Sequence, residues 1–278
     1  MALIAVLWIV AALSILVIGV TATVRQQIQT VGIQRDEASG QALGEAANAL
    51  VLQQLQVLRT PPSATTAVTV TYAGLPIEVQ VMPLDGLIAL NGAPPELLAA
   101  ALHFAGGLPA AQASALAAAV ADWGNGRFQG NLSGDALARA QPRQFEAVED
   151  LMLVPGFDYG LYARVAPLFS ADLDPGGRVN PAAAPPAVLL VLAQGNAGQA
   201  AQYAAQRASG QPGANTQGFN PRFLGGGASP FYRLSARIPL DAGKMLVLTQ
   251  DVALGSDYSP TAPWRLMRTD RQITPAIR

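Results

Sequence analysis

The chain has 278 residues, of which 51% are apolar and only 13% charged, and its formal net charge is −1. This length suits one large domain or two small ones with a core of their own. The balanced charge argues against a protein whose main work is to hold nucleic acid, because such proteins present basic surfaces. The absence of cysteine excludes disulfides, thiolate catalysis and cysteine-bound metals. The single histidine, His103, cannot form a histidine metal cluster, and its apolar surroundings favour a partly buried position in a helix.

The first 24 residues form an apolar segment with no charge before Arg25. As a helix rising about 1.5 Å per residue, they would span about 36 Å, enough to cross a bilayer core about 30 Å thick. A secretory signal has a basic start, a shorter apolar stretch and a small-residue cleavage site, whereas this segment is apolar from its first residue. We therefore predict a membrane anchor over residues 1–24 that is not removed.

The helical pattern continues past this anchor, because no proline occurs until Pro61 and apolar residues recur mostly at three- or four-residue steps. Three glycines lower the helix propensity locally, namely Gly32, Gly40 and Gly44. We predict one helix over nearly all of residues 1–60, with 1–24 in lipid and 25–60 packed on a globular head.

Strand signals, meaning runs of β-branched and aromatic residues, occur in two pairs that lie far apart in the chain. The pairs are 67–72 with 76–82, and 231–240 with 244–254. Each pair is separated by a short turn that contains glycine, and side chains alternate between apolar and polar along the strands. A last short run, 264–268, can add an edge strand. Together these runs predict an antiparallel sheet of four or five strands.

The long segment between the two strand pairs is rich in alanine and predicts helices. The predicted helices are 94–105, 109–123, 133–140, 144–153, 158–169, 185–193 and 197–208. The segment 209–230 follows them and is rich in glycine and proline, which predicts a mobile linker.

The predicted fold class is therefore α+β, with a long N-terminal transmembrane helix, an antiparallel sheet and a large all-α insertion. The predicted parts are the membrane half of the helix, its second half, a sheet domain formed by two segments, and an inserted helical domain. In residue numbers these are 1–24, 25–60, 61–90 with 215–278, and 91–214.

A weak internal repeat relates residues 86–94 to residues 177–185. Both segments begin with glycine, end with alanine and proline, and run directly into an aliphatic stretch. Proline is favourable in the first turn of a helix, because the N–H that it lacks has no partner there. We interpret both segments as structural starts of helices rather than as ligand sites.

Five stretches of the chain are similar to the minor pseudopilin K family (GspK/XcpX) of type II secretion systems. They are MALIAVLWIV at 1–10, GLIALNGAPPELLAAAL at 86–102, VEDLMLVPGFDYGLYARVAPLF at 148–169, GRVNPAAAPPAVLL at 177–190 and FYRLSARIPL at 231–240. The resemblance covers nearly the whole chain. It implies a type IV pilin-like fold. We predict no catalytic, cofactor-binding or metal-binding residues.

By this resemblance the chain is not an enzyme but a minor pseudopilin at the tip of the pseudopilus, a filament that helps to move folded exoproteins across the outer membrane. It would prime and cap that filament. The implied partners are the minor pseudopilins I, J and H, the major pseudopilin, the inner-membrane assembly platform, the lipid bilayer and a prepilin peptidase. The peptidase would cut a leader before Met1 and methylate the new N-terminus. The implied location is the inner membrane of a Gram-negative bacterium, crossed once, with the head in the periplasm.

By this resemblance, Ala5 occupies the position at which most type IV pilin-like proteins carry a glutamate. A carboxylate inside lipid is costly unless it is paired, and in pilin-like filaments its partner is the N-terminal ammonium of a neighbouring subunit. A subunit with no neighbour ahead of it has no such partner. Ala5 therefore fits a tip subunit, given the resemblance.

Calcium near Asp122 is an alternative to the prediction of no cofactor, since relatives often carry an acidic loop after an Asp-Trp pair. Here Asp122-Trp123 is followed by a loop with Asn125, Asn131 and one further carboxylate, Asp135. Calcium takes six to eight oxygens, several of them from carboxylates. Two carboxylates are few for such a site.

Nucleic-acid binding is the main alternative from another functional class. Residues 153–156, LVPG, resemble the turn of a helix-hairpin-helix, whose amides can hold a DNA phosphate. Four carboxylates surround the turn against one cation, Arg164, whereas phosphate binding needs cations. The carboxylates are Glu146, Glu149, Asp150 and Asp158. We interpret the turn as structural, and a DNA-uptake pseudopilin stays an alternative.

Two further alternatives are an enzyme and a generic membrane-tethered periplasmic module. Several aspartates could act as acid and base, but nothing in the sequence places two of them beside a nucleophile. They are Asp122, Asp150, Asp172 and Asp174. The glycine run 225–227 lacks the lysine of a phosphate loop. A tethered module would be favoured by a break in the long helix between Gly32 and Gly44.

Overall fold

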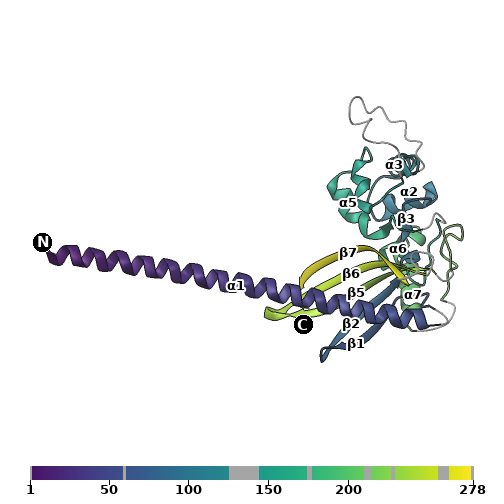
Figure 1. The fold of residues 1–278 in the computed structure, drawn as a ribbon. Helices are drawn as coiled ribbons and strands as arrows, with labels where there is room; N and C mark the ends of the chain where they lie inside the picture. The colour runs from purple at the N-terminus through teal and green to yellow at the C-terminus, as the bar shows by residue number, and fades with distance from the viewer. Residues whose placement is uncertain are drawn as a thin grey trace.

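The structure is a computed structural model in which a long helix carries a head made of a sheet and a lobe of short helices (Figure 1). We call residues 40–276 the head and residues 84–226 the helical lobe. Side chains at 1–5, 9–30 and 242 are not described. The structure describes residues 2–58, 61–124, 144–173, 177–209, 214–226, 229–255 and 263–276.

Helix α1 runs without interruption from Ala2 to Val57, which confirms the predicted long helix. Its 56 residues correspond to a length of about 84 Å. The N-terminal half projects away from the head, and the C-terminal half lies along the sheet (Figure 1). The helix does not break between Gly32 and Gly44, the feature that would favour a tethered module.

The predicted membrane anchor, 1–24, falls largely on positions whose side chains are not described. Within the part of the chain that is described, no helix is both long and apolar enough to span a bilayer. The anchor therefore stays a prediction.

Five antiparallel strands form the sheet, in the order β1-β2-β5-β6-β7. This confirms the predicted antiparallel sheet. The strands are β1 (Thr66–Tyr72), β2 (Leu75–Pro83), β5 (Phe231–Leu240), β6 (Lys244–Leu254) and β7 (Trp264–Pro275). The last strand is longer than the predicted 264–268, because β7 pairs with the whole of β6 although its second half is polar. Such a strand on a sheet edge need not show the alternation on which the prediction rested.

The helical lobe is inserted between β2 and β5, which are neighbours in the sheet. It lies at the end of the sheet opposite the free end of α1 (Figure 1). Its helices are α2 (Pro95–Phe104), α3 (Ala110–Gly124), α5 (Tyr159–Val165), α6 (Pro186–Leu192) and α7 (Ala197–Ala208). There are also short 3₁₀ helices: η1 (Leu84–Gly86), η2 (Val148–Leu153), η3 (Ala166–Leu168) and, between β5 and β6, η4 (Asp241–Gly243). The predicted helix 133–140 lies outside the described residues.

The predicted α-helix over 144–153 is wrong, because the described segment forms only the 3₁₀ helix η2. The Asp150 carboxylate accepts hydrogen bonds from the N–H groups of Glu146 and Ala147, at 2.8 and 3.0 Å. These bonds fold the start of the segment into a turn that competes with an α-helix. The predicted helix 158–169 likewise ends early, since α5 passes into η3 before Pro167.

The lobe is not all-α, which corrects the predicted fold class. Strands β3 (Ile88–Ala89) and β4 (Phe169–Ser170) form a small parallel sheet, and Val179 makes an isolated parallel bridge with Leu224. Strand β3 and Val179 belong to the repeated segments, so each segment contains extended residues ahead of its helix.

The described part of 209–230 is a packed segment, which contradicts the predicted mobile linker. Phe219 and Phe223 are buried in the lobe, and the Phe219 ring lies 5.0 Å from the ring of Tyr203. The Val179 N–H donates to the Phe223 carbonyl, and the Gly225 N–H donates to the Val179 carbonyl. The two aromatic residues therefore outweigh the flexible composition around them.

The head contains two hydrophobic clusters. One lies between α1 and the sheet and includes Val51, Leu55 and Tyr232. The other fills the lobe and extends onto the end of the sheet through Phe231 and Ala253. The lobe is therefore packed against the end of the sheet. The predicted domain boundaries stay predictions.

Candidate functional site

Within the described residues, the surface of α1 and a polar cleft between sheet and lobe are candidate functional sites. On α1, two of the three glycines lie where the helix contacts the sheet. A Cβ atom on Gly44 would lie 2.9 Å from Ile238 Cδ1 and 3.0 Å from Leu248 Cδ2, and one on Gly40 would lie 2.8 Å from Leu240 Cδ2. These glycines let helix and sheet approach closely, a role that their low helix propensity alone does not indicate.

A buried polar pair fixes α1 on the sheet at one point. The Asn48 side-chain amide donates to Gln250 Oε1 on β6 at 3.0 Å, and Asn48 is fully buried. Within the described residues, Asn48 Oδ1 has no hydrogen-bond partner. If the helix shifted along the sheet, the bond between Asn48 and Gln250 would break and would leave further buried polar atoms unpaired, which is costly. The bond therefore favours this position of the helix.

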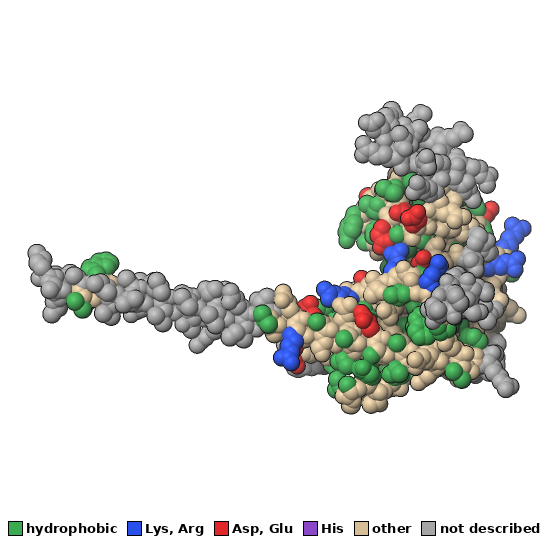
Figure 2. Space-filling model, viewed as in Figure 1, with side chains coloured by type: hydrophobic (Ala, Val, Ile, Leu, Met, Phe, Trp, Pro, Cys, Tyr) green, Lys and Arg blue, Asp and Glu red, His purple; other side chains and the backbone are tan. Residues whose placement is uncertain are grey.

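The part of α1 that projects beyond the head carries exposed apolar side chains. Val31 and Ile33 are 62% and 50% exposed, and Trp8, farther along the projecting half, is 73% exposed. Figure 2 shows hydrophobic side chains at the surface of the projecting helix where its side chains are described, so the face that a single chain leaves uncovered is partly apolar. Such a face suits contact with lipid or with other helices.

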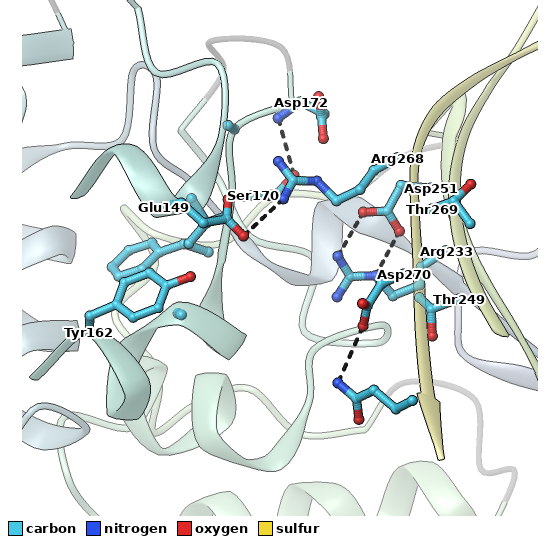
Figure 3. Close-up of a pocket in the computed structure, with 15 residues that line it drawn as sticks. Glu149, Tyr162, Ser170, Asp172, Arg233, Thr249, Asp251, Arg268, Thr269 and Asp270 are labelled. Atoms are coloured by element: carbon cyan, nitrogen blue, oxygen red, sulfur yellow. Dashed lines mark hydrogen bonds and ion pairs between the residues drawn. The ribbon is translucent and has the colours of Figure 1, made fainter. Parts of the chain in front are cut away.

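The cleft has a volume of about 410 Å³ and lies between the sheet and the lobe (Figure 3). Its sheet side carries Arg233 on β5, Asp251 on β6, and Arg268 and Asp270 on β7; its lobe side carries Glu149, Tyr162 and Asp172. Arg233 forms a bidentate pair with Asp251, with both N–O distances at 2.7 Å. Paired and fork-shaped bonds of this kind are among the strongest that side chains form.

A second ion pair crosses the cleft and links the lobe to β7. Arg268 lies 3.0 Å from a Glu149 carboxylate oxygen (Figure 3). Partial burial acts in the opposite direction, but hydrogen bonds from its own backbone amide and from Arg268 lower the pKa of Glu149. Burial raises the pKa of Tyr162, and the nearby charge of Glu149 raises it further.

Asp172 lies in the same cleft with a raised pKa, caused mainly by burial and opposed by the charge of Arg268. Its backbone N–H donates to Ser170 Oγ at 3.2 Å. Of the other aspartates considered as acid and base, Asp122 and Asp150 do not line this cleft, and Asp174 lies outside the described residues. Two ion pairs between arginines and carboxylates lie in this cleft: Arg233–Asp251 joins two neighbouring strands of the sheet, and Arg268–Glu149 joins the sheet to the lobe.

The LVPG turn has its expected position between two short helices, with Gly156 at a φ of +102°. The Asp158 side chain accepts from the N–H of Leu161 at 2.6 Å and so occupies the start of α5. Arg164 donates through Nε to the Gly106 carbonyl, at 2.9 Å. An acidic cap and an arginine directed at the backbone do not favour a phosphate at this turn.

His103 lies near the end of α2, as expected, and its Nδ1 is 2.6 Å from the Leu108 carbonyl. The loop considered for calcium lies outside the described residues from 125 to 143, whereas Asp122, Trp123 and Gly124 are described as the end of α3. Among the residues that are described, no three His, Cys, Asp or Glu side chains gather as metal ligands would.

The repeated segments pack against each other, which the sequence did not indicate. Gly177 lies so close to the Gly92 carbonyl that a Cβ atom would be 2.5 Å from it. Asn180 is buried, and its side chain donates to the Ser63 carbonyl at 2.8 Å and lies 3.4 Å from Asp85. Asn91 in the first repeat is also buried and bonds to Phe145 in both directions. An asparagine inside each aliphatic segment was the available signal.

Comparison with known proteins gives a likeness of fold. No protein-family model and no curated protein matches the chain. A chain from the crystal structure of the GspK–GspI–GspJ complex of the type 2 secretion system of enterotoxigenic Escherichia coli is similar, with a TM-score of 0.55 and 17% sequence identity. The match covers 90% of this chain and 99% of that chain. The long helix, antiparallel sheet and inserted lobe therefore form a pseudopilin-like fold.

Proposed function

We propose that this chain is a minor pseudopilin K of a type II secretion system, anchored in the inner membrane with its head in the periplasm. The observation that carries the proposal is the combination of an unbroken α1, half of it projecting from the head, with a lobe at the opposite end of the sheet (Figure 1). The fold likeness to a chain of the GspK–GspI–GspJ complex supports it.

The position of the lobe gives the proposed tip role a physical basis. In a filament built from parallel helices, the next subunit is added along the direction of α1. A lobe at the end opposite the free end of α1 would occupy the space in which a further head would sit. The chain would then start the filament and close its end, and Ala5 would need no ammonium partner.

The proposed partners are minor pseudopilins I and J, with H and the major pseudopilin below them in the filament. The proposal assigns no reaction and no cofactor to the chain. The ion pair of Arg268 with Glu149 would help to hold the lobe on the sheet, which would keep the shape of the tip fixed.

The test is co-expression of the full chain with the minor pseudopilins I and J of the same secretion system, followed by purification through a tag on this chain alone. We expect a stable 1:1:1 complex with this chain at one end. A chain that does not associate, and that instead retains DNA in a salt-sensitive manner, would refute the proposal and support the DNA-uptake alternative.

A further inference from the structure

Strand β1 forms one edge of the sheet and pairs with β2 alone. Over the described residues, no strand pairs with its outer side, and β1 lies along the lower border of the head in Figure 1. An open edge presents a row of unpaired backbone N–H and C=O groups, which is a template for another strand.

The two edges of the sheet differ in how they are protected. β7 carries three arginines and an aspartate, and its pairing with β6 shifts register at Asp251/Val252. Charges and bulges are the usual devices that keep foreign strands off an edge. β1 has the sequence TAVTVTY, with no charge, proline or glycine. It combines high β propensity with none of these devices.

The turn after β1 determines which of its backbone groups face outward. Tyr72 pairs with Leu75 across a two-residue turn, in which Ala73 and Gly74 have φ angles of +50° and +79°. In such a hairpin the closing pair is hydrogen-bonded, and bonded residues alternate along the strand. Three residues of β1 therefore direct their N–H and C=O groups away from the sheet: Ala67, Thr69 and Thr71.

The side chains beside this edge define what fits it. Val70 is buried under α1 and Val68 is half-buried, while Tyr72, on the same side of the strand, is 44% exposed. An added strand would place every second side chain beside these three. The pairs that suit this side are β-branched with β-branched, and β-branched with aromatic. The carboxylate next to this edge, Glu78 on β2, forms an ion pair with Arg237 at 3.2 Å, so its charge has a partner within the sheet.

We propose that β1 binds an extended, uncharged segment of another protein, rich in β-branched residues, by adding it to the sheet as a strand. Main-chain hydrogen bonds would supply the affinity, and the side chains beside Val68 and Tyr72 the preference. A second copy of this chain fits less well: antiparallel pairing through β1 turns one copy by half a rotation, so its α1 would point away from the shared membrane. This last step rests on the proposed membrane anchoring.

The probe is a synthetic peptide of the β1 sequence, TAVTVTY, with a solubilising tail outside the seven residues. It is titrated onto the full chain in detergent, and binding is read by fluorescence anisotropy and by hydrogen exchange. We expect slower exchange at Ala67, Thr69 and Thr71. Thr69→Pro removes an outward N–H without removing a bond to β2, and should weaken binding at least tenfold. Thr69→Ala keeps that N–H and should bind within twofold.

Equal binding to Thr69→Pro and Thr69→Ala, with both variants folded by circular dichroism, would overturn the proposal, as would no binding to either. The chain has no cysteine, so Thr69→Cys gives a separate readout. A disulfide-linked dimer formed through position 69 would make a second copy the occupant and would also overturn it. None of these readings depends on whether the chain takes part in secretion.

Discussion

Arg233 on β5 and Asp251 on β6 lie directly opposite each other in the sheet and form two parallel hydrogen bonds of 2.7 Å, with the Asp251 side chain only 2% exposed. Arg237, on the same strand, forms a single 3.2 Å contact with Glu78, and both side chains are about half exposed, at 48% and 51%. One strand thus carries a buried and an exposed ion pair.

Arg233→Ala should lower the free energy of unfolding by about 3–5 kcal/mol, because it leaves a buried carboxylate without its partner. Arg237→Ala is the matched control and should cost about 0–1 kcal/mol. Both values come from urea unfolding of the full chain in detergent. Equal losses in the two variants would show that the burial of Asp251 does not matter.

Gly44→Leu should destabilise the head by about 1–3 kcal/mol, since a side chain there meets Ile238 and Leu248. Gly32→Leu is the control, because nothing lies within 4 Å of a Cβ atom at Gly32. Leucine has the higher helix propensity at both positions. The thermal unfolding midpoint should therefore shift downward for Gly44→Leu and not for Gly32→Leu. An upward shift of both variants, which helix propensity alone would give, would contradict the close contact at Gly44.

Asp85 should make the head less stable as the pH rises. Burial raises the pKa of Asp85, against hydrogen bonds from Asn180 and its own backbone. The folded state therefore binds the proton more tightly, and stability is lost as the pH climbs from the unfolded value of about 3.9 through the folded pKa. The asparagine side chain of Asp85→Asn does not titrate. The melting temperature of this variant should therefore increase relative to that of the wild type as the pH rises across this window.

Glu149 gives the opposite sign and serves as the control for this pH series. Since its pKa is lowered in the folded state, its contribution is present above the unfolded value of about 4.3 and is lost as the pH falls through the folded pKa. The melting temperature of Glu149→Gln should therefore decrease relative to that of the wild type as the pH rises through this range. Parallel curves for Asp85→Asn and Glu149→Gln would contradict the assigned directions.

Phe219→Ala should cost about 3–5 kcal/mol, because it removes a buried ring that contacts Tyr203. Arg222→Ala, at an exposed position three residues later, should change stability by less than about 0.5 kcal/mol. Chemical unfolding distinguishes a packed segment from a linker: in a linker, neither substitution would matter.

The parts of the fold that the sequence predicted are those with a long, regular pattern. Helix α1 and the strands of the two hairpins are long enough for periodicity to show. The failures are local. Asp150 folded 144–153 into a turn through side-chain bonds, and two phenylalanines anchored a segment whose glycines and prolines indicated mobility.

The cleft could not be found from the sequence. Arg268 meets Glu149 across 119 positions of the chain, and Arg233 meets Asp251 through the register of two strands. Neither spacing forms a motif, because tertiary packing and strand register, not local sequence, bring these charges together. The pilin-like architecture follows from the family resemblance of five stretches of the chain, which relates helix, sheet and insertion in a way that periodicity alone cannot.

Helix α1 contacts both hairpins of the sheet, β1 with β2 and β5 with β6, and the second pair follows the first only after the whole lobe. Among the helix residues whose side chains are described, the first buried one is Gly40. Any shortened version of the chain, made for crystallisation or for binding assays, must therefore keep the helix from Gly40 onward. A cut placed farther along would remove part of the helix that contacts both hairpins, which lie more than a hundred residues apart in the chain. The shortened protein would then lack packing contacts of the intact head.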